Sequence, residues 1–238
     1  MAIDYVQGDP FASPSKIRLI IPSQQRPLHA SWLEPKIRKV AVEDVLARAV
    51  AKAVRNLQID IKGSGKSGAI FFDAPKQQVI ERTAVQISPD AITVCLSVGL
   101  PANGRRINGR QAQRLFSEAI PAILQQSIFA ISDEEINQAV VLADQQAAIR
   151  DTMKENSWIG FVANGAILPR KSGVNDLPLK DAIHFQSPKS FETEISIPHQ
   201  CEPLKGMAIP KGVTLIVGGD ITVKAHCSMH LKWVSTIM

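Results

Sequence analysis

The chain has 238 residues, of which 45% are hydrophobic and 21% are charged. This composition is typical of a globular protein with one large domain or two modest ones, and it excludes a disordered chain. With 27 Lys and Arg residues against 22 Asp and Glu residues, the net charge of +5 allows an anionic partner without requiring one. The single Tyr argues against an aromatic-rich nucleic-acid platform over the whole chain.

The cysteines and the apolar runs predict a cytoplasmic protein that does not cross a membrane. Cys95, Cys201 and Cys227 are too few and too widely spaced for a disulfide framework, which favours a reducing compartment. The sequence starts with a turn-forming segment rather than a signal peptide, and its longest apolar run is well below the ~18 residues of a membrane span.

The first half alternates predicted strands and helices. Runs of β-branched and other apolar residues predict strands over residues 17–22, 69–73 and 91–98. Apolar residues at i, i+3 and i+4 spacing predict a helix over residues 40–57. The opposite face of that helix carries Arg48, Lys52 and Arg55.

Two further helices are predicted. Residues 111–127 have a helical pattern that Pro121 should divide in two, because proline cannot continue the backbone hydrogen bonds. A longer helix should start at Ser132 and run to about Asn156. The Ser132 hydroxyl can accept from the free amides of the first turn, and the Glu135 carboxylate, three residues later, can accept from the backbone N–H of Ser132.

After Asn156 the composition and the periodicity of the sequence change. Gly, Pro, Asn and Ser become frequent, helical periodicity is lost, and only short strands are predicted, at residues 193–197 and 213–217. We therefore expect a domain boundary at residue 156.

A first candidate phosphate loop lies at residues 63–68, with the sequence GSGKSG. Gly-Lys-Ser is the closing half of a P-loop, whose lysine and hydroxyl reach phosphate and magnesium. However, Asp60 stands where the opening glycine belongs, and a predicted strand rather than a helix follows. The segment is therefore expected to be a flexible turn between two strands.

A second candidate loop starts at Gly218 and Gly219, which follow the apolar run 213–217 as the start of a P-loop should follow a strand. The closing half is missing, because Lys224 is preceded by Val223 and followed by Ala225, without the glycine and the hydroxyl that the motif requires. Synonymous codons would allow a shifted reading frame to restore Gly-Lys-Ser here. We therefore expect residues 220–238 to be an out-of-frame tail with no designed role.

Several sequence blocks together resemble the predicted ATPases of the ABC class, a group distinct from the transporters. The resemblance covers the chain from Asp4 to about Gly219. Its blocks are VQGDPFASPS from Val6, GKSGAIFFD from Gly65, QQVIERTAV from Gln77, VGLPANGRRINGR from Val98, FVANGAILPRKSGVNDLPL from Phe161 and GMAIPKGVTLIVGG from Gly206.

This resemblance implies an α/β fold with a mixed sheet. Residues 1–156 would form the family's N-terminal α+β domain, incomplete at its start, and residues 157–219 would begin an ABC-type nucleotide-binding domain, with its antiparallel strands before the P-loop. Intact relatives would bind and hydrolyse ATP with magnesium. Gly218 and Gly219 would be the remnant of the Walker A loop. Arg170 and Ser172 lie in the polar segment 167–173, which would touch the nucleotide in an intact enzyme; the alternative is a structural turn.

The resemblance also implies that this chain is a truncated member. Because phosphoryl transfer relies on a lysine, a magnesium ion and a positioned water, a chain that lacks these parts is expected not to hydrolyse ATP, and no catalytic residue is predicted. His226, Cys227 and His230 cluster like metal ligands, but a zinc site usually needs four, so no metal site is predicted.

The alternative is a module that binds RNA or another protein without a nucleotide. Arg105, Arg106 and Arg110 concentrate positive charge around a turn at Asn103 and Gly104. Together with the basic residues of the helix at 40–57 they would form one basic groove; otherwise both are ordinary solvated faces. A third interpretation is a decayed fragment that folds poorly because its sheet edge is unpaired.

Overall fold

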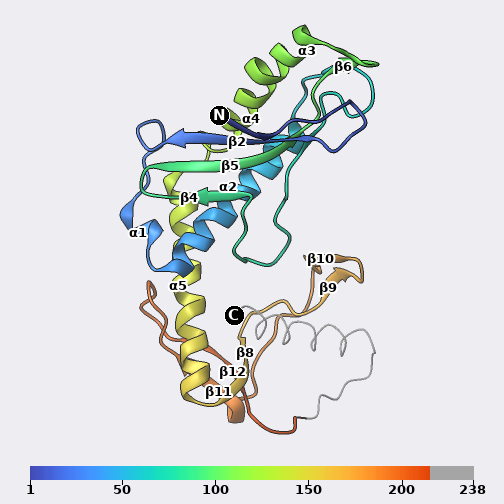
Figure 1. Ribbon diagram of the computed structural model, residues 1–238. Helices are drawn as coiled ribbons and strands as arrows, with labels where there is room; N and C mark the ends of the chain where they lie inside the picture. The colour runs from blue at the N-terminus through green and yellow to red at the C-terminus, as the bar shows by residue number, and fades with distance from the viewer. Residues whose placement is uncertain (215–238) are drawn as a thin grey trace. The chain divides into compact units, whose positions relative to one another are not determined.

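The computed structural model describes residues 1–214. The chain divides into two compact units, Met1–Val140 and Val141–Met238. Helices and strands are mixed in sequence in both, which confirms the α/β class (Figure 1). No helix in the described part of the chain is long and apolar enough to cross a membrane.

The first unit is built on a five-stranded sheet. The strands lie in the order β1-β2-β5-β3, with β4 also paired to β5, and every pairing is antiparallel. A separate two-stranded hairpin of β6 and β7 follows β5. The strands are β1 (Ala2–Tyr5), β2 (Ser15–Pro22), β3 (Ile70–Phe71), β4 (Val85–Ile87), β5 (Ala91–Val98), β6 (Ala102–Asn103) and β7 (Arg106–Ile107).

The two central strands alternate strictly between buried and less buried side chains, as a sheet with one covered face requires. Ile17, Leu19 and Ile21 of β2 point into the core, and so do the apolar residues of β5 from Ile92 to Val98. The three strands predicted in this half are confirmed, although β3 is shorter than predicted.

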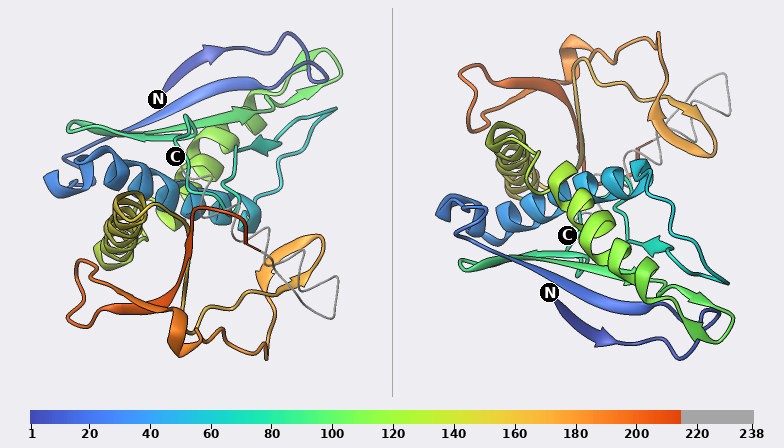
Figure 2. Two further views of the ribbon diagram at one scale, coloured as in Figure 1. Left: turned by 90° about the horizontal axis from the view of Figure 1, so that it is seen from below. Right: turned by 90° about the horizontal axis from the view of Figure 1, so that it is seen from above.

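Helices cover one face of this sheet (Figure 2). The predicted helix at 40–57 is confirmed as α2 and starts one turn earlier than predicted. Its outward residues Arg48, Lys52 and Arg55 are exposed, as expected. The helical segments of this part are α1 (Ala30–Leu33), α2 (Lys36–Asn56), α3 (Gly109–Arg114), the π-helical segment η1 (Leu115–Ala119) and α4 (Ile120–Gln126).

The α-helix predicted over residues 111–127 is divided before Pro121, but by a π-helical segment rather than by a break in the helix. Helical structure is continuous from α3 through η1 to α4, and Pro121 is the second residue of α4. The wider π-helical turn directly before it replaces the regular hydrogen-bonding pattern at the point where a proline cannot donate. The chain therefore passes the proline without leaving the helix.

Helix α5 (Asp133–Glu155) begins in the first unit and continues in the second. Its predicted start is confirmed: the backbone N–H of Glu135 donates to Ser132 Oγ at 3.2 Å, and the backbone N–H of Ser132 donates to Glu135 Oε2 at 3.3 Å. These reciprocal bonds satisfy two amides that would otherwise have no partner in the helix.

The second unit holds a three-stranded antiparallel sheet in the order β11-β12-β8 and a hairpin of β9 and β10. The short strand expected at 193–197 is confirmed as β11, whereas most of the range 213–217, where another was expected, lies outside the described residues. All pairings described are antiparallel, so the mixed sheet is not found among residues 1–214. The elements are β8 (Trp158–Ala163), β9 (Arg170–Ser172), β10 (Asn175–Pro178), η2 (Lys189–Phe191), β11 (Glu192–Ile195) and β12 (Leu204–Pro210).

Candidate functional site

The GSGKSG loop at residues 63–68 is hydrogen-bonded to two other segments of the first unit. The backbone N–H of Lys66 donates to Pro10 O at 2.8 Å, and that of Ser64 donates to Ala102 O at 2.7 Å. On its far side, Gly68 N–H donates to Gly99 O at 2.8 Å. The predicted turn is present and β3 follows it, but irregular chain after α2 rather than a strand precedes it, and the loop bridges the segments after β1 and after β5.

The glycines here are required by close packing. A Cβ on Gly99 would lie 1.8 Å from Lys66 O, and a Cβ on Gly65, which has a φ of +60°, would lie 2.5 Å from Pro10 O. Side chains at either position would push two backbone segments apart. The glycine pattern that resembles a phosphate loop thus has a purely steric explanation in this structure.

The groups that would contact phosphate in a P-loop are engaged within the protein. The Lys66 ammonium donates to Ala12 O at 2.9 Å. The Ser67 hydroxyl donates to Ser64 O at 2.5 Å and accepts from the backbone N–H of Ala102 at 3.1 Å. Moreover, β3 rather than a helix follows the loop in the sequence, so the strand, loop and helix order of a P-loop is not present here.

The same loop holds the hairpin that carries the predicted arginines. The backbone N–H of Gly104, which has a φ of +60°, donates to Ser64 Oγ at 2.9 Å, which confirms the predicted turn. Arg105 and Arg106 lie at the tip of this hairpin and Arg110 in the first turn of α3, and all three side chains are exposed. None of them forms an ion pair with a carboxylate among the residues that the structure describes.

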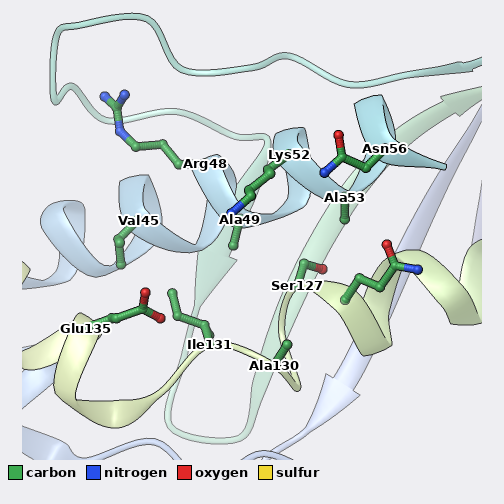
Figure 3. Close-up of a pocket in the computed structure, with 11 residues that line it drawn as sticks. Val45, Arg48, Ala49, Lys52, Ala53, Asn56, Ser127, Ala130, Ile131 and Glu135 are labelled. Carbon is green, nitrogen blue, oxygen red and sulfur yellow. The ribbon is translucent and has the colours of Figure 1, made fainter.

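The basic residues of α2 lie at two other places. Arg48 and Lys52 line a cleft of about 420 Å³ between α2 and the segment that runs from the end of α4 to the start of α5, with Ile131 on the opposite wall (Figure 3). Arg55 lines a separate cleft of about 290 Å³ beside β3. The guanidinium of Arg48 already contacts Asp44 Oδ2 at 2.6 Å and Lys76 O at 2.5 Å.

The six basic candidates do not share one of these two clefts. None of the three arginines around the β6–β7 hairpin lines either cleft of α2. A single groove formed by all six residues stays a prediction.

The candidates in the second unit are distributed differently. Arg170 and Ser172 both lie on β9, where they pair with Pro178 and Asn175 of β10, and Ser172 is exposed. Gly218 and Gly219 lie outside the described residues, as do Lys224 and the cluster from His226 to His230. Within residues 1–214, no group of three His, Cys, Asp or Glu side chains could hold a metal ion.

One feature of the site was not found from the sequence. The Phe11 ring is 69% exposed, and its backbone N–H donates to Asp9 Oδ1 at 2.8 Å. An Asp two residues before an aromatic residue is a signal for such a side-chain turn. The position of Phe11 beside the arginine hairpin depends on contacts between segments that are distant in the sequence. No local sequence pattern reveals such contacts.

Two family models match the sequence. The model described as ATPase of the ABC class, N-terminal, matches residues 1–130, which is more than half of the chain, and the P-loop domain model of the same class matches residues 132–227. No curated protein matches. The chain belongs to the family of ABC-class ATPases.

Proposed function

We propose that intact members of this family bind ATP and magnesium at a P-loop that corresponds to Gly218 onward, and that a polypeptide with this sequence does not hydrolyse ATP. The observation that carries the proposal is the sequence after Gly219, where Val223 and Ala225 stand at the places of the glycine and the hydroxyl residue. Without that hydroxyl the magnesium ion loses a ligand, and a β-branched residue restricts the backbone that should surround the phosphates.

The other Gly-Lys-Ser sequence of the chain does not compensate. The Lys66 ammonium and the Ser67 hydroxyl are bound to backbone carbonyls, and β3 follows them. This arrangement supports the view that ATP binding in the family depends on the second unit.

Measurement of phosphate release and of binding of a fluorescent ATP analogue by the purified chain tests the proposal. We expect no magnesium-dependent turnover above the buffer background. Enzyme-like turnover by the unmodified chain would disprove the proposal.

A second candidate function is binding of RNA by the first unit. The exposed Arg105, Arg106 and Arg110, without carboxylate partners in the described part of the chain, favour contact with a phosphate backbone. Association that weakens steeply with salt and needs no ATP would support this function, and salt-independent association would argue against it.

We also propose that the protein works in the cytoplasm. Cys95 and Cys201 are free thiols, which is usual in reducing compartments. Retention of both thiols in protein isolated from cells, measured by alkylation before lysis, tests this assignment.

A further inference from the structure

Phe11 and the arginine hairpin lie side by side, because consecutive residues of the 63–68 loop hold them. Ser64 Oγ accepts from Gly104 at the tip of the hairpin, and a Cβ on the next residue, Gly65, would lie 3.0 Å from Cδ1 of the Phe11 ring. In all three views of Figures 1 and 2 the chain after β1 runs beside the β6–β7 hairpin. The ring and the hairpin therefore belong to one surface.

The Phe11 ring is presented on a fixed backbone. Asp9 Oδ1 accepts from the backbone N–H groups of Phe11 and Ala12 at 2.8 and 3.0 Å, and the next loop residue, Lys66, donates to Pro10 O and Ala12 O. Phe11 is 69% exposed, and its turn is held by these hydrogen bonds. A flat partner could therefore bind the ring with little additional ordering of the chain.

The charge around the ring is positive. Lys62, Arg105, Arg106 and Arg110 are exposed at this end of the unit, and Asp9 and Asp60 are the acidic residues of the adjoining segments. One carboxylate oxygen of Asp9 is engaged by two backbone amides. The cations thus outnumber the carboxylates, and the surface favours an anionic partner.

We propose that this surface, consisting of Phe11, Arg105 and Arg106, binds a single-stranded nucleic acid, with one base stacked on Phe11 and the flanking phosphates on the two arginines. The proposal deepens the second candidate function and rests on it. Base faces are available for stacking in a single strand, whereas a duplex hides them between neighbouring base pairs. The P-loop-like segment then has a positioning role, because Ser64 and Gly65 set the distance between the ring and the hairpin.

Fluorescence anisotropy with labelled oligouridine of about 12 nucleotides tests the proposal, with a duplex of the same length as the comparison. Phe11→Ala should weaken binding of the single strand roughly 10-fold and leave its salt dependence unchanged, because stacking involves no counterion release. Phe11→Tyr should retain binding. Phe191→Ala, which removes a ring 62% exposed in the second unit, is the matched control and should have no effect.

Arg106→Gln should act differently from the Phe11 variant. It should weaken binding and lower the slope of log K against log salt by about 0.7, since one phosphate contact is lost. Lys180→Gln, which removes an exposed cation of the second unit, is the control for charge and should leave the slope unchanged.

The outcomes distinguish RNA binding by the first unit from the more specific proposal that a base stacks on Phe11. If the unmodified chain shows no salt-dependent RNA binding, the second candidate function fails and this inference with it. If it binds, but Phe11→Ala binds equally well or the duplex binds as tightly as the single strand, only the inference fails. Stronger binding of an acidic peptide at the same salt would also overturn it. Should Phe11→Ala not fold, as judged by circular dichroism, Phe11→Leu keeps an apolar side chain beside Gly65 and removes the aromatic face.

Discussion

The two compact units differ in how much apolar material they bury. The first has one continuous core that joins the sheet to α2, η1, α4 and the start of α5. The second, in the described part of the chain, has a small core of Met153, Phe161, Ile195 and Ile197. Because buried apolar area is the main source of stability, the first unit should fold by itself, while the second should be the more easily opened.

The largest change in the free energy of unfolding should follow from a substitution in the core of the first unit. Leu46 is fully buried on α2, so Leu46→Ala should lower the free energy of unfolding by about 2–5 kcal/mol. Phe161→Ala should instead increase hydrogen exchange in the second unit and leave the urea transition of the first unchanged. Ile20→Ala, at a position 46% exposed on β2, is the control, with an expected change within about 0.5 kcal/mol. Equal shifts of one shared transition by Leu46→Ala and Phe161→Ala would mean that the units do not unfold separately.

Close backbone contacts allow a matched test in both units. A Cβ on Gly99 would lie 1.8 Å from Lys66 O in the first unit, and a Cβ on Gly206 would lie 2.3 Å from Val162 O in the second. Gly99→Ala should cost about 1–3 kcal/mol and be visible in the urea transition, whereas Gly206→Ala should loosen the second unit alone. Gly109→Ala meets no atom within 4 Å and should be neutral or slightly stabilising in the same assay.

The cap of α5 should have a smaller effect. Ser132→Ala removes the hydroxyl that accepts from Glu135 N–H, and loss of such a cap costs about 1 kcal/mol. Urea denaturation followed at 222 nm measures the change, and Ser132→Asp, which keeps an acceptor, should restore most of it. A loss as large in Ser132→Asp as in Ser132→Ala would show that the hydroxyl does not act as a cap.

The smallest effect should be a dependence of stability on pH. Burial raises the pKa of Glu43, although the backbone N–H of Ile87, which donates to its carboxylate at 3.0 Å, acts in the opposite direction. A raised pKa in the folded state means that this carboxyl group stabilises the fold when protonated, and this stabilisation is lost as the pH rises through the raised pKa. Compared with Glu43→Gln, the unmodified chain should therefore be relatively more stable at about pH 4 than at about pH 7. A difference between the two that does not change with pH would contradict this expectation.

Local features could be predicted from the sequence, whereas contacts between distant segments could not. The capping pair at Ser132 and the strand β5 follow from residue types at short spacing, and both are present. The continuous helix through Pro121 depends on an unusual turn that propensities do not indicate.

The engagement of Lys66 has a practical consequence for biochemical work on this chain. A search for the P-loop lysine by motif alone would select Lys66, and its replacement by alanine would be made as the customary inactive control. Such a variant would lose the hydrogen bond to the Ala12 carbonyl and would destabilise the first unit. A loss of activity in this variant would then be wrongly attributed to a loss of nucleotide binding, although the lysine has a structural role here.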